Sequence, residues 1–356
     1  MKIKFWHLIL VTFLFFCACS EDKPKEIIPD PPPVDDPIDD PVDDESDLVV
    51  LAYVTSWTSI MPNPKYITHI NYAFAHVTNS FDGIRIDNES RLTNIVGLKK
   101  QKPKLKVLLS IGGWESGRFS EMAADDTYRQ AFAADCQRVI EQFDLDGVDL
   151  DWEYPTSSSA GISSSPDDTK NFTLLMRDIR EAIGEDKLLT LASAASARYV
   201  DFVGIDPYID FVNIMTYDMG NPPRHHSALY PSGTTTSCCD KAVNDHVKAG
   251  VPINKLTLGI PFYGHGNGTD APSSVDYRNI GNSPGLFEAW DDVAKVPYKT
   301  NSNGVFVLTY DNPRSIAIKC EYVLDKGMLG AMYWEYAGDN DEDHLRKAVY
   351  NGIMKK

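Results

Sequence analysis

From residue 48 onward, the spacing of apolar and polar positions switches repeatedly between two patterns. Short, nearly continuous apolar runs, typical of strands buried on both faces, alternate with segments of helical periodicity. In 128–143, for example, apolar side chains recur at the spacing of one helix face, and 168–183 is a second predicted helix. Eight runs are predicted strands: 49–57, 67–77, 107–114, 147–154, 188–194, 211–218, 256–264 and 328–336.

This alternation predicts an α/β fold in which helices cover a parallel sheet. Eight strand–helix units suit a (β/α)8 TIM barrel, and we expect one such domain over 48–356. A doubly wound open sheet is the alternative. Such sheets often bind a dinucleotide through a Gly-x-Gly-x-x-Gly turn after the first strand, and the sequence has no such turn there. The pattern therefore favours the barrel, and we expect no cofactor.

The first 19 residues have a different character. Lys2 and Lys4 precede an apolar run at 8–16, which is the pattern of an export signal and is too short for a stable membrane span. Ala18 stands directly before Cys19, and this pair resembles a bacterial lipobox. We therefore expect 1–19 to be a lipoprotein signal peptide ending at Cys19, which would be lipidated. An ordinary secretory signal is the alternative.

Residues 20–47 are rich in proline and hold twelve acidic residues and two lysines, a net charge of −10. Repelling charges and fixed proline φ angles prevent a packed core, so we predict a disordered tether. Calcium binding by the aspartates is the alternative. Glu21 and Asp22, one and two residues after the Ser20 that follows Cys19, resemble the surface-export signal of Bacteroidetes lipoproteins. This resemblance implies an exported outer-membrane lipoprotein, exposed at the cell surface and held at the membrane only by its lipid.

Charge and cysteine content limit the partners of the remaining chain. The whole sequence has a net charge of −17, of which −9 falls on 48–356. An acidic domain repels nucleic-acid phosphates, so we expect no nucleic-acid binding, whereas an uncharged substrate is compatible. The cysteines match no zinc spacing, and we assign no metal site. In an exported protein some cysteines could form disulfides, and the alternative is that all stay as buried or free thiols. The cysteines in question are Cys136, Cys238, Cys239 and Cys320.

Polar and aromatic residues end several of the predicted strands. In a TIM barrel, the C-terminal ends of all strands meet at one rim, where the reactive groups lie. Aromatic rings bind sugar faces and carboxylates exchange protons, so this rim would suit carbohydrate chemistry. These residues are Trp57, Trp114, Glu153, Tyr217, Asp218, Tyr263 and Trp334.

One predicted strand carries three carboxylates at alternate positions. Side chains along a strand point alternately to opposite faces, so Asp149, Asp151 and Glu153 point into the barrel. Carboxylates so close together cannot all be ionised comfortably, and at least one retains a proton. Glu153 is the outermost and is best placed to deliver that proton to a substrate. A metal site or a cluster neutralised by arginines is the structural alternative.

The spacing of these acids resembles the signature of glycoside hydrolase family 18, the chitinase family. Asp146, Asp149, Asp151 and Glu153 match all of its acidic positions, and 152–155 is similar to the chitinase branch. Further segments are similar to other strand motifs of the family, so the resemblance covers nearly all of 48–340. They are Tyr53 with Trp57, 72–74, 110–114, 215–218 and 330–334.

The resemblance implies a retaining, substrate-assisted mechanism, which is an exception to the usual scheme of two catalytic carboxylates. Glu153 would protonate the glycosidic oxygen. The acetamido oxygen of the sugar at subsite −1 would attack the anomeric carbon and form an oxazolinium ion. Asp151 would hold the acetamido N–H and share a proton with Asp149. Tyr217 would hydrogen-bond the acetamido carbonyl and complete the catalytic set.

The resemblance also implies residues that bind substrate. At subsite −1, Trp334 would form the floor, and Tyr53 and Met215 would line the pocket. Asp218 would lie near the scissile bond, Trp114 would stack at subsite +1, and Trp57 would bind sugar further along the cleft. Phe74 and Tyr263 would also contact substrate.

Three features need separate treatment: one acid that does not point into the barrel with Asp149, Asp151 and Glu153, and two departures from the family pattern. Asp146 falls out of the alternating set, so we expect it to support the start of its strand. His265 stands where deep-cleft chitinases often carry arginine. The segment from 265 to about 308 is short for the extra module of processive chitinases, which implies a small insertion after the seventh strand. A smaller module suggests a more open cleft, hence endo-acting or short-oligomer cleavage.

The main hypothesis is thus a monomeric chitinase-like hydrolase acting on chitin, chito-oligosaccharides or related N-acetylglucosamine glycans. An endo-β-N-acetylglucosaminidase acting on N-glycans uses the same acid and acetamido chemistry, although Trp152 and Pro155 favour the chitinase branch. A non-catalytic chitin- or glycan-binding lectin on the same barrel is the alternative from another class. Such proteins typically lose the acid or an inner aspartate, and this sequence keeps them all.

Overall fold

The computed structural model describes residues 46–281 and 283–355. The predicted signal peptide, Cys19 and nearly all of the predicted tether lie outside these residues. Within the described part of the chain, no helix has the length and hydrophobicity to cross a membrane.

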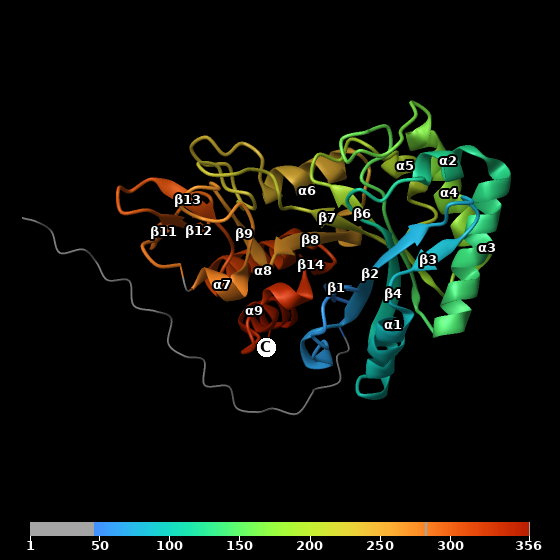
Figure 1. Cartoon of the computed structure of the whole chain (residues 1–356), viewed down its shortest axis with the longest axis horizontal. Coiled ribbons are helices and arrows are strands. Elements are labelled where there is room, and N and C mark those ends of the chain that lie inside the picture. The colour runs from blue at the N-terminus through green and yellow to red at the C-terminus, as the bar shows by residue number, and fades with distance from the viewer. Residues whose placement is uncertain (1–45, 282, 356) are drawn as a thin grey trace, which may run out of the picture. The chain divides into compact units, whose positions relative to one another are not determined.

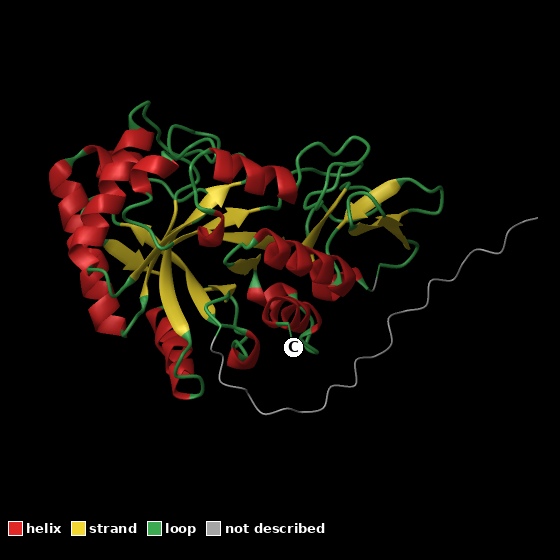
Figure 2. Cartoon of the chain, turned by 180° about the vertical axis from the view of Figure 1, so that it is seen from behind, coloured by secondary structure: helices red, strands yellow, loops and turns green. Residues whose placement is uncertain are grey.

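Eight parallel strands close into a barrel, which confirms the predicted (β/α)8 TIM fold and rules out the open sheet (Figures 1 and 2). Closure is made by β1, which pairs in parallel with both β2 and β14. A short strand, β3 (Ile84–Ile86), adds an antiparallel edge to β2. The barrel strands are β1 (Val49–Thr55), β2 (His69–Val77), β4 (Lys106–Gly112), β5 (Gly147–Asp151), β6 (Leu188–Ala194), β7 (Phe211–Met215), β8 (Leu256–Pro261) and β14 (Gly330–Trp334).

Helices surround this barrel, and both predicted helices are found. Helix α3 (Asp126–Phe143) begins where the Asp125 carboxylate accepts hydrogen bonds from the first backbone N–H groups, as an N-cap does. Helix α8 (Pro313–Lys326) begins with a capping box formed by Asn312 and Ser315. The other helices are α1 (Glu89–Val96), α2 (Phe119–Ala124), α4 (Asp168–Ile183), α5 (Phe202–Ile205), α6 (Cys239–Lys248) and α9 (His344–Met354).

Trp152, the residue directly after β5, packs against the helices as the alternation predicts. Trp152 stacks on Phe119 of α2, with ring centroids 5.4 Å apart, and meets Phe172 of α4 edge-on. Asp146 lies just before this strand and accepts a hydrogen bond from the backbone N–H of Val107. Two lysines pair with the same carboxylate. The structural role expected for Asp146 is therefore confirmed.

A second sheet is inserted after the seventh barrel strand, as expected (Figure 1). The predicted strand 256–264 is in fact two strands, because the chain leaves the barrel at Phe262, whose ring stacks on Tyr333. Tyr263 therefore belongs to the insertion and does not end a barrel strand. The insertion contains β9 (Tyr263–Gly266), β10 (Val275–Asp276), α7 (Tyr277–Ile280), β11 (Phe287–Asp291), β12 (Val296–Thr300) and β13 (Phe306–Thr309).

Four cysteines lie in the described residues, and all are buried and free, so none of these thiols pairs with another. They are Cys136, Cys238, Cys239 and Cys320. Cys238 lies directly before α6, and Cys239 is its first residue.

Candidate active site

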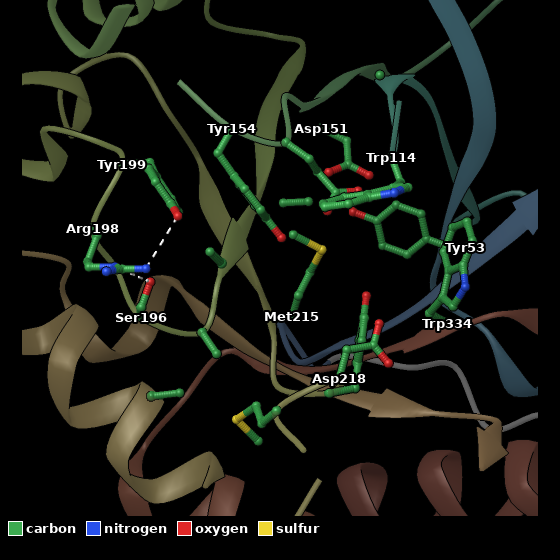
Figure 3. A pocket seen from close by; sticks show the side chains of 18 of the residues that line it. Tyr53, Trp114, Asp151, Tyr154, Ser196, Arg198, Tyr199, Met215, Asp218 and Trp334 are labelled. Atoms are coloured by element: carbon green, nitrogen blue, oxygen red, sulfur yellow. Dashed lines mark hydrogen bonds between the residues drawn. The ribbon is translucent and has the colours of Figure 1, made fainter. Parts of the chain in front are cut away.

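A cavity of about 850 Å³ opens at the C-terminal ends of the barrel strands (Figure 3). Asp149 is buried below it, and Tyr263 lines an adjoining cavity of about 300 Å³. The structure therefore brings together nearly all of the predicted site residues that it describes. Those that line the larger cavity are Tyr53, Trp57, Phe74, Trp114, Asp151, Glu153, Met215, Tyr217, Asp218 and Trp334.

Asp149 lies at the centre of the barrel with 0% of its surface exposed. Its Oδ2 accepts hydrogen bonds from the hydroxyls of Tyr53 (2.9 Å) and Ser110 (2.8 Å). Its Oδ1 accepts hydrogen bonds from the Thr190 hydroxyl (2.6 Å) and the Asn213 amide (3.2 Å). Burial raises the pKa of Asp149, while these four donors oppose that rise. The carboxylate is thus satisfied on all sides.

Ser110, Thr190 and Asn213 were not singled out from the sequence. Each is an isolated polar residue inside an apolar strand, which is the signal that could have found them. The four donors to Asp149 are hydroxyl and amide groups, and they occupy both of its oxygens. The expected sharing of a proton between Asp149 and Asp151 therefore stays a prediction.

Asp151 is the last residue of β5, which ends earlier than the predicted strand 147–154, so Glu153 lies two residues beyond it. Both acids line the cavity. Asp151 is buried, and its Oδ1 has no hydrogen-bond partner among the described residues. Burial, together with the charges of Glu153 and Asp149, raises the pKa of Asp151 well above its usual range. Burial and the nearby Asp218 raise the pKa of Glu153 to about 7, against an opposing interaction with Tyr154. Both acids therefore keep protons at pH values where an exposed carboxyl is ionised.

Aromatic rings form one wall of the cavity. Trp334 stacks with Phe74 at a centroid distance of 5.6 Å and lies 5.7 Å from the ring of Tyr53. Trp57 and Trp114 are 64% and 55% exposed. Large apolar rings exposed beside a cavity are typical of a binding surface. The wall thus offers flat faces to a ligand.

A second aromatic group lies near Glu153 and was missed from the sequence. Tyr154 stacks on Tyr199, with ring centroids 4.8 Å apart. Arg198 donates hydrogen bonds to the hydroxyls of Tyr199 and Ser196 (Figure 3). All of these residues except Tyr154 come from the loop after β6, where nothing in the residue types distinguishes them from other loop residues.

Asp218 lies beyond the end of β7, in the left-handed region of backbone space with a φ of 56°. Its Oδ1 accepts hydrogen bonds from the Tyr263 hydroxyl (2.6 Å) and from Nε2 of His265 (2.8 Å). Burial acts to raise the pKa of Asp218, but His226, His265 and Tyr263 outweigh it and bring that pKa below its usual range. Asp218 is therefore a fixed negative charge near Glu153, and His265 contacts it directly.

The site can bind a neutral ligand along aromatic faces and donate a proton to it from Glu153. A carboxyl group with a pKa near the working pH is well suited to general acid and base catalysis. Tyr217 is buried beside these carboxyls, and burial with the nearby negative charges raises its pKa well above its usual range. Its hydroxyl therefore remains a hydrogen-bond donor.

Comparison with known proteins gives a consistent result. The model of "Glycosyl hydrolases family 18" matches residues 49–339. Chitinase A1 of Niallia circulans is 36% identical over 295 residues, which cover 69% of this chain and 42% of that protein. The chain thus spans less than half the length of this relative.

Solved structures agree with this match. A family 18 N-acetylglucosaminidase from Paenibacillus barengoltzii superposes with a TM-score of 0.78 at 35% identity, over 86% of this chain and 99% of that one. Chitinase ChiW from a Paenibacillus strain, described as a cell-surface-expressed multi-modular enzyme, gives a TM-score of 0.80 at 30% identity over 86% of this chain and 42% of that one. Because the family model matches most of its length, the chain belongs to glycoside hydrolase family 18.

Proposed function

We propose that this protein is a chitinase-type hydrolase that cleaves β-1,4 bonds between N-acetylglucosamine residues. The observation that carries this proposal is Glu153, which lines the cavity with its pKa raised to about 7 and lies just beyond the strand that carries two buried acids. A group with this pKa is protonated often enough at neutral pH to act as an acid, and it is ionised often enough to act later as a base.

The mechanism that we propose is the substrate-assisted one that the family resemblance implies, and the order of these groups is compatible with it. Glu153 protonates the glycosidic oxygen, and the acetamido oxygen of the −1 sugar attacks the anomeric carbon, so the substrate supplies the nucleophile. Asp151 holds the acetamido N–H, and Tyr217 donates a hydrogen bond to the acetamido oxygen as charge redistributes. Water activated by the now ionised Glu153 then opens the oxazolinium ring, with net retention.

The aromatic wall supports binding of more than one sugar. Trp334 packs against Phe74 and Tyr53, which supports its proposed role as the floor of subsite −1. The exposed rings of Trp57 and Trp114 extend the binding surface beyond it. We propose endo-acting cleavage or cleavage of short oligomers. A product profile dominated by processive release of dimers would contradict this.

The competing substrate is an N-glycan core, which an endo-β-N-acetylglucosaminidase would cleave with the same chemistry. Mass analysis of products from chito-oligosaccharides, chitin and a high-mannose glycoprotein separates the two. We expect hydrolysis of the chito-oligosaccharides by the wild type and at least about 10²-fold slower hydrolysis by Glu153→Gln. Release of glycan alone would favour the competing substrate. Binding of chitin without any hydrolysis would indicate a lectin.

We also propose that the protein is exported and anchored at the cell surface through a lipid on Cys19. The support is the lipobox-like Ala18–Cys19 pair and the nearby acidic residues Glu21 and Asp22. In the native host, Cys19→Ala should release the protein from the membrane fraction, and mass spectrometry should find the lipid on the wild-type N-terminal peptide. Equal membrane retention of both forms would contradict the anchor.

A further inference from the structure

Three side chains with metal-binding atoms meet where the barrel joins the inserted sheet. Asp218 and His226 come from the segment after β7, and His265 comes from β9. One atom of each lies within 4.8 Å of the others. Asp218 and His265 also line the smaller cavity of about 300 Å³, so small solutes can reach these two members of the cluster, and His226 is buried beside them.

His226 is the unusual member of this cluster. It is 0% exposed, and neither of its ring nitrogens has a hydrogen-bond partner among the residues that the structure describes. Its Nδ1 lies 3.8 Å from Asp218 Oδ1, too far for a hydrogen bond, and its ring lies 4.7 Å from that of His265. Burying a polar ring without hydrogen-bond partners costs free energy of folding. The position of this ring, next to a carboxylate and a second imidazole, points to a ligand that would supply the missing partner.

The adjacent histidine shows that this is not a general property of the loop. Nδ1 of His225 contacts the Thr309 hydroxyl at 3.3 Å, and its Nε2 contacts the Asp291 carboxylate at 3.2 Å. Both nitrogens of His225 are therefore satisfied by protein groups. Those of His226 are not, although its ring is fully buried.

We propose that Asp218, His226 and His265 bind a divalent transition metal of the Zn²⁺ class, and that the bound ion inhibits the enzyme. Two imidazoles and one carboxylate form a donor set that Zn²⁺ prefers. Ligands of a tetrahedral Zn²⁺ at its usual bond lengths lie about 3.4 Å apart. The pairs here are 2.8 and 3.8 Å apart around Asp218 Oδ1, so modest rotations of the side chains complete the geometry. The cavity leaves room for a water as the fourth ligand.

Inhibition follows from what Asp218 does in the proposed reaction, and this part of the inference rests on the proposed function. A metal on Oδ1 neutralises the Asp218 charge that acts on Glu153 and displaces the Tyr263 hydroxyl from the same oxygen. The ion would also stand between the barrel and the insertion, where it obstructs the adjoining cavity. Binding of the metal does not depend on the enzyme's activity.

The test measures binding and activity separately on the full chain after removal of metals with a chelator. Calorimetry with Zn²⁺ should give one equivalent, and Co²⁺ should give the visible absorption of a tetrahedral site. His226→Asn should weaken Zn²⁺ binding at least about tenfold, since even loss of an outer-shell partner costs that much. The double variant that combines His226→Asn with His265→Asn should abolish Zn²⁺ binding. His344→Asn, which changes an exposed histidine paired with Glu342, is the matched control and should bind like the wild type.

Unchanged binding in the double variant, or equal loss in His344→Asn, would overturn the site. Circular dichroism shows whether the variants fold. Anomalous scattering from a zinc-soaked wild-type crystal tests the site without variants: an ion at these three residues would support it, and an ion elsewhere would overturn it. Glu153→Gln should bind Zn²⁺ normally, so failure of the proposed activity leaves the binding result intact. Zn²⁺ should inhibit hydrolysis by the wild type and spare His226→Asn, and binding without inhibition would overturn the inhibitory role.

Discussion

The hydroxyl of Tyr53 donates a hydrogen bond of 2.9 Å to Oδ2 of Asp149, across a separation of 96 residues in the chain. This bond ties β1 to β5 through the interior of the barrel. It also fixes the innermost acid of the carboxylate row in place.

Tyr53→Phe should lower the free energy of unfolding by about 1 kcal/mol, because Asp149 loses one of its four donors. It should also reduce kcat, since Tyr53 lines the cavity. Tyr72→Phe is a matched control: its buried hydroxyl donates to backbone carbonyls of Asp87 and Asn88, outside the cavity. Denaturant titration and kinetics should show destabilisation in both variants but loss of activity only in the first. Equal loss of activity would mean that Tyr53 matters only for stability.

Glu153→Gln should lower kcat by at least about 10²–10⁴-fold with a much smaller change in KM, because the amide binds like the acid but donates no proton to the leaving group. Steady-state kinetics on a fluorogenic chito-oligosaccharide measure both constants. Glu181→Gln, an exposed change on α4, should behave like the wild type. Turnover by Glu153→Gln within a fewfold of the wild type would remove Glu153 from the mechanism.

The pH profile of kcat/KM should fall as pH rises through about 7, because the acid form of Glu153 is the active one and its pKa is raised to about 7. The negative charge of Asp218 contributes to that rise. Asp218→Asn should therefore move the alkaline limb to lower pH as well as reduce the maximal rate. An unchanged limb in Asp218→Asn would show that another group controls it.

Stability should depend on pH through the same glutamate. Its pKa is raised from the usual 4.5 to about 7 in the folded protein. Below pH 4.5 the group is protonated in both the folded and the unfolded state, so it does not reduce the free energy of unfolding. The cost to folding grows between the two values and is complete above the upper one, where a partly buried carboxylate is ionised. Glu153→Gln should thus be more stable than the wild type above pH about 8, by up to about 3 kcal/mol, and equal to it near pH about 4. Denaturant titrations at both pH values measure this difference, and a constant offset would contradict it.

Two tryptophans should respond oppositely to truncation. Trp114 is 55% exposed beside the cavity, so Trp114→Ala should leave stability within about 0.5 kcal/mol and raise KM for longer chito-oligosaccharides roughly two- to tenfold. Trp152 is 3% exposed and packs between Phe119 and Phe172, so Trp152→Ala should cost about 3–5 kcal/mol. Thermal unfolding and kinetics on both variants test the pair. Similar destabilisation in both would mean that Trp114 also supports the fold.

Strand boundaries at the rim were predicted less well than the strands themselves. The apolar pattern runs through 211–218, yet β7 ends at Met215, and Tyr217 and Asp218 belong to the following loop. A run of apolar and aromatic residues does not reveal where hydrogen bonding to the neighbouring strand stops. The same limit hid the break at Phe262, where the chain passes from the barrel into the inserted sheet.

The sequence by itself determined the barrel, the carboxylate row and its direction, because these depend on local periodicity and on a motif within one strand. Asp149 and Asp151 lie on one face of β5 as alternation requires, and Glu153, two residues beyond the strand, lines the same cavity as Asp151. Only the tertiary structure decided which groups surround them. The donors to Asp149 lie 39, 41, 64 and 96 residues away, and barrel closure alone brings them to one point. The grouping of Asp218, His226 and His265 likewise depends on how the inserted sheet packs against the loop after β7, which no spacing in the sequence encodes.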